Sequence, residues 1–214
     1  MRILLTNDDG VHARGLEVLE RIARTLSDDI TIVAPLEEQS GKGRSLSLTD
    51  PVRLRRFGDR RFAVTGTPTD AVMMALAEIM KESPPDLILS GVNRGANLAE
   101  DVSYSGTVSA AMEGALAGIR SIALSQRHAA PAPGERVSFE AAEQWGERVL
   151  RPLIDAQWAP RTLMNVNFPP IPAVSPPSLC HEAEGSPAHV TCSPSLPCCR
   201  ATKHASSWWS RVYA

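Results

Sequence analysis

Short apolar runs alternate with segments of helical spacing over most of the chain. The runs have the length of buried strands, and they occupy residues 2–5, 30–34, 86–90, 121–124 and 162–166. The segments between them carry apolar residues at helical spacing, at 16–26, 71–80, 108–118 and 139–154. Alternation of this kind predicts an α/β fold with a parallel sheet.

Two local patterns add detail to this prediction. Residues 52–57 and 61–64 predict a small β-hairpin whose outer face is rich in arginine, which we interpret as a solvated face rather than a binding patch. Thr67, Pro68 and Asp70 fit the N-cap, the first helical position and an acidic capping box. A helix should therefore begin at this point.

Two adjacent acids, Asp8 and Asp9, follow the first predicted strand directly. Adjacent carboxylates at the end of a buried strand repel each other and lose water, and a hard divalent cation held by oxygen ligands offsets that cost. Gly10 gives the backbone the freedom to turn there. The alternative is that one of the two acids only caps the following helix.

Further polar loops follow the other predicted strands, and we expect them to meet the acid pair at one edge of the sheet. Ser40 and Asn93 add a hydroxyl and an amide oxygen, which magnesium, manganese or calcium accept together with carboxylates. Residues 91–107 are expected to be a long loop that ends at Ser105-Gly106-Thr107, where a helix N-terminus favours an anion. A metal beside an anion suggests phosphoryl chemistry.

Composition excludes several other classes of protein. A formal net charge of −2 over 214 residues provides no basic field for nucleic acid or a membrane surface. Neither a signal peptide nor a membrane-spanning run is recognisable, so a cytoplasmic location is expected. Dinucleotide, P-loop and nucleophile-elbow motifs are missing from the expected positions, and His12 is interpreted as a structural residue.

The character of the chain changes near residue 170. Residues 169–214 hold eight of the 17 prolines, and all four cysteines lie at or beyond Cys180. Because no apolar period survives there, we expect a core at 1–170 and an atypical tail at 171–214 that is disordered, truncated or out of frame.

The first 170 residues resemble the stationary-phase survival protein SurE family of metal-dependent nucleotidases. The resemblance rests on the linked motifs ILLTNDDG from residue 3, GTPTD from residue 66, SGVNRGAN from residue 90 and YSGTVSAA from residue 104. It implies a Rossmann-like three-layer sheet. It also implies hydrolysis of nucleoside 5′- and 3′-monophosphates, with exopolyphosphatase activity as a side reaction, in a homodimer or homotetramer.

The resemblance also implies roles for individual residues. One divalent cation, magnesium or manganese, would be held by Asp8, Asp9, Ser40 and Asn93, with Asp8 and Asp9 as the catalytic pair. The substrate phosphate would be bound by Asn97, Ser105, Gly106 and Thr107. The attacking group is either water or a carboxylate of the pair. The alternative function is a nucleotide- or phosphate-binding protein that lost its activity together with a regular C-terminus.

Overall fold

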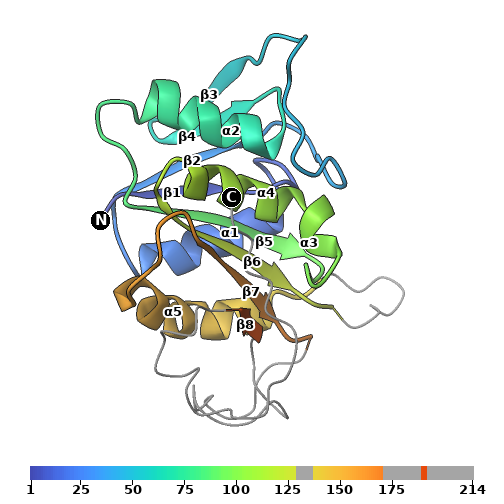
Figure 1. Cartoon of the computed structure of the whole chain (residues 1–214), viewed down its shortest axis with the longest axis vertical. Helices are drawn as coiled ribbons and strands as arrows, with labels where there is room; N and C mark the ends of the chain where they lie inside the picture. Colours follow the sequence, from blue (N-terminus) through green and yellow to red (C-terminus); the bar gives the residue numbers. More distant parts are fainter. Residues whose placement is uncertain (129–136, 171–188, 192–214) are drawn as a thin grey trace.

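The computed structural model describes residues 1–128, 137–170 and 189–191. They form one sheet with the strand order β3-β4-β2-β1-β5-β6-β7-β8 (Figure 1). The strands are β1 (Ile3–Thr6), β2 (Ile30–Pro35), β3 (Leu54–Gly58), β4 (Arg61–Val64), β5 (Leu87–Arg94), β6 (Arg120–Gln126), β7 (Leu163–Phe168) and β8 (His189–Thr191). Neighbouring strands in the part of the sheet that runs β4-β2-β1-β5-β6-β7 pair in parallel. At the two edges, β3 pairs antiparallel with β4, and β8 pairs antiparallel with β7.

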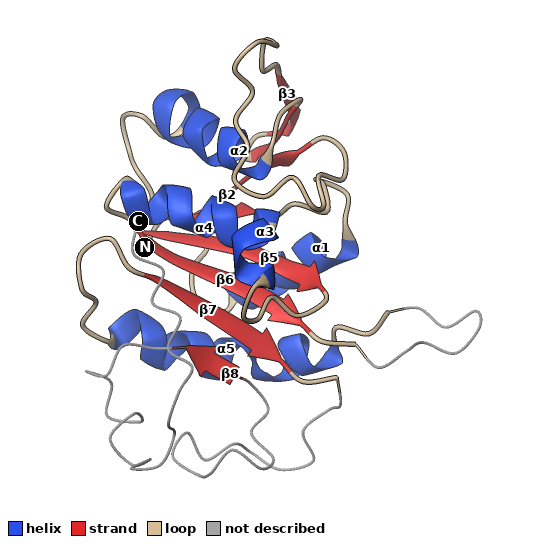
Figure 2. Ribbon diagram, turned by 45° about the vertical axis from the view of Figure 1, so that its right-hand side comes forward, coloured by secondary structure: helices blue, strands red, loops and turns tan. Residues whose placement is uncertain are grey.

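Helices cover both faces of this sheet, so the predicted three-layer α/β fold is confirmed (Figure 2). They are α1 (Arg14–Arg24), α2 (Pro68–Met74), α3 (Asp101–Tyr104), α4 (Gly106–Leu116) and α5 (Glu140–Asp155), and a π-helical turn, Ala75–Ile79, extends α2. Apolar side chains of α1 and α5 share one core with the sheet, and those of α2 and α4 pack on the other face.

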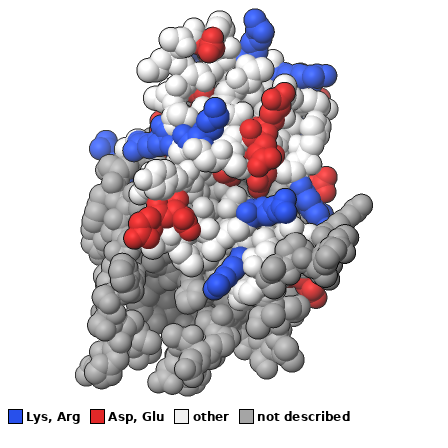
Figure 3. All heavy atoms as spheres, turned by 90° about the vertical axis from the view of Figure 1, so that its right-hand side faces the viewer, with Lys and Arg blue, Asp and Glu red and all other residues white. Residues whose placement is uncertain are grey.

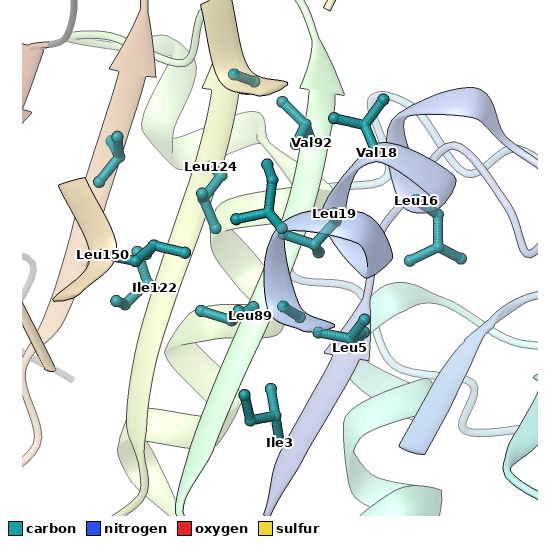
Figure 4. Close-up of a cluster of buried hydrophobic side chains, with 14 of the residues drawn as sticks. Ile3, Leu5, Leu16, Val18, Leu19, Leu89, Val92, Ile122, Leu124 and Leu150 are labelled. Carbon is teal, nitrogen blue, oxygen red and sulfur yellow. The ribbon is translucent and has the colours of Figure 1, made fainter. Parts of the chain in front are cut away.

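The central strands are buried on both faces because a helix layer lies on each side. In β1, Ile3 and Leu5 pack in the core under α1 and α5, whereas Leu4 points to the opposite core. Figure 4 shows Leu16 and Leu19 on α1, which crosses in front of the sheet. This two-sided burial explains why the strands read as continuous apolar runs in the sequence.

The predicted helix start at Thr67 and the predicted hairpin are also confirmed. The side chain of Thr67 accepts a hydrogen bond from the Asp70 backbone N–H at 3.2 Å, and Asp70 Oδ2 accepts one from the Thr67 N–H at 2.8 Å. Together they form the capping box that begins α2. The hairpin of β3 and β4 forms as predicted, and every residue of β3 is exposed.

The prediction of one long loop at 91–107 is wrong. Strand β5 continues to Arg94 through an irregularity between Ser90 and Asn93, after which Asn93 pairs with Ser125 of β6. Gly91 permits this because its φ is +139° and a Cβ there would lie 2.2 Å from the Leu124 carbonyl oxygen. The short helix α3 then occupies part of the remaining segment.

The C-terminal region contributes β8, which pairs antiparallel with β7 and which the sequence did not predict. The rest of the predicted tail, with all four cysteines, lies outside the described residues. In the described part of the chain, no helix combines the length and the apolar character needed to cross a membrane.

Candidate active site

The predicted site lies where the order of the strands reverses. The chain passes from β1 to β2 on one side, and β5 later adds to the other side of β1. Ligands of open α/β sheets bind at the carboxyl ends of the strands at such a point. Asp8 and Asp9 follow the end of β1, and Asn93 and Arg94 end β5. Figure 3 shows acidic and basic side chains gathered close together on the face of the molecule that includes this edge.

Asp8 is enclosed by the first turn of α4. Its side chain is 4% exposed, its Oδ1 accepts a hydrogen bond from the Thr107 hydroxyl, and the Thr107 backbone N–H also binds the carboxylate. A Cβ on Gly106 would lie 2.7 Å from the Asp8 Cβ and 2.9 Å from Oδ2, so only glycine allows this approach. The positive end of the α4 dipole therefore faces Asp8.

The two acids resist ionising together. Burial raises the pKa of Asp8, and the Glu38 carboxylate raises it further. Burial and then the charge of Asp8 raise the pKa of Asp9 to about 6, although the Arg94 backbone N–H and guanidinium act in the opposite direction. A cation at this position would remove the repulsion and allow both carboxylates to stay ionised.

The loop after β2, which carries Ser40, is fixed at the backbone of Asp8. The Gln39 N–H donates to the Asp8 carbonyl oxygen at 2.8 Å, which fixes the loop beside the end of β1. The Ser40 hydroxyl donates to Glu38 Oε1 at 2.9 Å. Its oxygen therefore keeps its lone pairs for a cation or a water molecule.

Asn93 and Asn7 supply amide oxygens at the same edge. Asn93 Nδ2 donates to the Gly95 carbonyl at 2.9 Å, so Oδ1 is the atom that could meet a cation. Asn7 Nδ2 donates to the Gly10 carbonyl at 2.9 Å and holds the turn, in which Gly10 has a φ of +100°. Asn7 Oδ1 is buried and makes no hydrogen bond within the described structure.

This donor set fits a hard divalent cation. Two carboxylates, a hydroxyl and an amide are all oxygen donors, and magnesium in proteins is commonly held by one or two carboxylates together with substrate phosphates. The described residues contain no group of three or more histidine, cysteine, aspartate and glutamate side chains placed to hold a metal.

The residues that were predicted to bind phosphate make hydrogen bonds within the protein. The Ser105 hydroxyl accepts from the Val108 N–H at 3.1 Å as the N-cap of α4, and the Thr107 hydroxyl donates to Asp8. Asn97 Nδ2 donates to the Ser125 hydroxyl, and the Asn97 N–H donates to Asn167 Oδ1, each at 2.8 Å. Phosphate binding by these residues stays a prediction, and the structure shows that they also hold the site together.

A cavity of about 450 Å³ lies beside Asp9, and the sequence did not predict it. It is lined by Asp9, Ala13, Arg14, Gly15, Glu38, Arg94, Val137 and Phe139. The sequence held one sign of this cavity, the position of Arg94 directly after the predicted ligand Asn93. His12, in contrast, contacts Phe57 of the hairpin with ring centroids 5.1 Å apart.

The family model described as Survival protein SurE matches residues 3–187. The chain belongs to the SurE family. The "5'-nucleotidase SurE" of Rhizorhabdus wittichii is 76% identical over 169 residues, and that of Erythrobacter litoralis is 64% identical over 173 residues. A crystal structure of the SurE protein from Aquifex aeolicus superposes with a TM-score of 0.73 at 37% identity.

These alignments cover most of this chain and less of the SurE proteins. The alignment with the Rhizorhabdus wittichii protein spans 79% of this chain and 66% of that protein. The alignment with the Erythrobacter litoralis protein spans 81% of this chain and 68% of that protein. The superposition on the Aquifex aeolicus structure spans 80% of this chain and 67% of that structure. The chain therefore spans about two thirds of the length of these SurE relatives. Every site residue described above lies within the range that the family model matches.

Proposed function

We propose that this chain is a divalent-metal-dependent phosphohydrolase that releases phosphate from nucleoside 5′- and 3′-monophosphates, with polyphosphate as a secondary substrate. The observation that carries the proposal is the Asp8–Asp9 pair, in which Asp8 is buried under the N-terminus of α4 and Asp9 is half-buried beside it. The names of the relatives support action on 5′-nucleotides. Metal dependence is supported by the donor set and by the raised pKa values of the acids.

The chain's own residues divide the work between holding the cation and holding the phosphate. Asp8, Asp9, Ser40 and Asn93 would hold the cation, which when bound polarises the phosphoryl group and lowers the pKa of a water molecule. Thr107 orients the Asp8 carboxylate by its hydroxyl and its backbone N–H. Within the described part of the chain, the Ser105 hydroxyl proton and the Gly106 N–H make no hydrogen bond, so they are free to bind the phosphate oxygens.

Water is the nucleophile that fits this arrangement better than a carboxylate does. Asp8 is 4% exposed and its Oδ1 already accepts a hydrogen bond from Thr107. Asp9 accepts from the Arg94 backbone N–H. Both carboxylates are thus oriented as ligands, and their attack on phosphorus would require these contacts to break.

The proposal is tested by phosphate release from a panel of nucleoside 5′- and 3′-monophosphates, with magnesium, with manganese and with excess chelator. We expect turnover that disappears in chelator, returns with metal and is abolished in Asp8→Asn. Asp59→Asn is the matched control, because the Asp59 side chain lies on the hairpin and is 99% exposed. Full turnover in excess chelator would refute metal dependence. Binding of nucleotides without any turnover would identify the chain as a non-catalytic binding protein instead.

A further inference from the structure

The cavity beside Asp9 has the size and position of a substrate subsite. Its volume of about 450 Å³ lies in the range of small-molecule sites, roughly 300–1,000 Å³. Asp9 belongs both to its wall and to the acid pair. A ligand whose phosphate meets the acid pair would therefore extend into this cavity.

Two arginines of the cavity wall have no hydrogen-bonded or ion-paired partner among the described residues, although the Arg94 guanidinium acts electrostatically on Asp9 and His128. Arg14 and Arg94 make no hydrogen bond through their side chains and no ion pair there, whereas Arg61, for example, binds the Glu20 carboxylate. Arg14 is also the first residue of α1, where the helix dipole disfavours a cation. Both guanidinium groups are therefore available to a ligand that offers acceptor atoms or a π-face.

Apart from Glu38, the remaining part of the wall is apolar and partly fixed. Val137 and Phe139 line it, and Phe139 is 4% exposed. The Phe139 ring meets the His128 ring edge to face, with centroids 5.4 Å apart. An apolar wall together with guanidinium groups suits a heterocyclic base, because bases pack on apolar side chains and stack on arginine planes. A bare phosphate chain would gain nothing from Val137 and Phe139.

We infer that this cavity is the subsite for the nucleobase, with Arg14 and Arg94 as the residues that bind the base; the inference rests on the proposed function. The phosphate lies at Asp8 and Asp9, and the base lies against Phe139. The arginines donate hydrogen bonds to acceptor atoms on the edge of the base or stack on its face. Bases that carry adjacent acceptors, such as guanine with O6 and N7, match two guanidinium donors well.

The test compares substrates that differ only in the base. The measured quantity is kcat/KM for GMP divided by kcat/KM for ribose 5-phosphate, so that changes at the acid pair affect both terms alike. We expect Arg14→Ala and Arg94→Ala each to lower this ratio by about tenfold, which is typical of losing one stacking or cation–π contact. Arg24→Ala is the matched control, because Arg24 ends the same helix and pairs with Glu20.

An unchanged ratio in both variants would overturn the inference. It would also be overturned if the variants lost turnover of tripolyphosphate but kept the ratio, because the cavity would then hold a second phosphate. If the parent released phosphate from neither substrate, the proposed function would fail, and calorimetric titration with guanosine would still decide the subsite. Saturable guanosine binding that is lost in the double variant supports it, and a parent that binds no guanosine contradicts it.

Discussion

Replacing Asp9 by asparagine should stabilise the metal-free protein while it disables the site. Burial and the neighbouring Asp8 raise the Asp9 pKa from its ordinary 3.8 to about 6. An acid whose pKa is higher in the folded state holds its proton more tightly there. Its ionisation therefore lowers the free energy of unfolding as the pH rises from about 4 to about 6, and the full penalty remains above that range.

The size of the penalty follows from the same values. The difference between 3.8 and about 6 corresponds to about 3 kcal/mol, at about 1.4 kcal/mol for each tenfold change in the proton affinity. Because Asp9 is only half-buried, solvent screening reduces this figure to about 2 kcal/mol. The gain in Asp9→Asn should thus be near zero at pH 4 and about 2 kcal/mol at pH 8.

Urea denaturation in excess chelator at these two pH values measures the gain. Asp59→Asn, which removes an exposed carboxylate from the hairpin, controls for the loss of a negative charge. Saturating manganese should reverse the order at pH 8, because only the parent keeps the full ligand set. A variant that is less stable than the parent at pH 8 in chelator, or whose gain does not depend on pH, would refute the reasoning.

Two further predictions test the packing of α4 on Asp8. Thr107→Val removes the hydroxyl that donates to the buried carboxylate, so it should cost about 2 kcal/mol in urea denaturation at pH 8 and reduce phosphate release. Thr107→Ser should keep both the stability and the phosphate release of the parent. Equal behaviour of the two variants would contradict this role of the hydroxyl. Gly106→Ala places a Cβ 2.7 Å from the Asp8 Cβ, so it should displace Asp8, cost roughly 1–3 kcal/mol and weaken manganese binding; parental affinity for manganese would contradict the close approach.

The fold was predictable because its signals are local. Apolar runs such as 30–34 mark strands that are buried on both faces, and Thr67, Pro68 and Asp70 carry the start of α2 within four residues. The rule that polar groups gather at the carboxyl ends of parallel strands then placed Asp8, Asp9, Ser40 and Asn93 at one edge.

The remaining features depend on contacts between distant segments. The hydrogen bond from Thr107 to Asp8 joins residues 99 positions apart, and nothing near either residue signals it. The cavity joins Arg14, Arg94 and Phe139 from three separate segments of the chain. The continuation of β5 past Gly91 depends on its pairing with β6, and glycine hid that strand from the apolar pattern.

We propose above all that one divalent cation at Asp8 and Asp9 makes the chain a nucleotidase. The most direct measurement follows phosphate release from a nucleoside 5′-monophosphate while manganese is titrated into chelator-treated protein and its binding is recorded in the same samples. We predict that activity rises in proportion to the first manganese bound for each chain and that Asp8→Asn shows neither the binding nor the activity. Full phosphate release before any manganese binds, or binding at full occupancy in Asp8→Asn, would contradict the account.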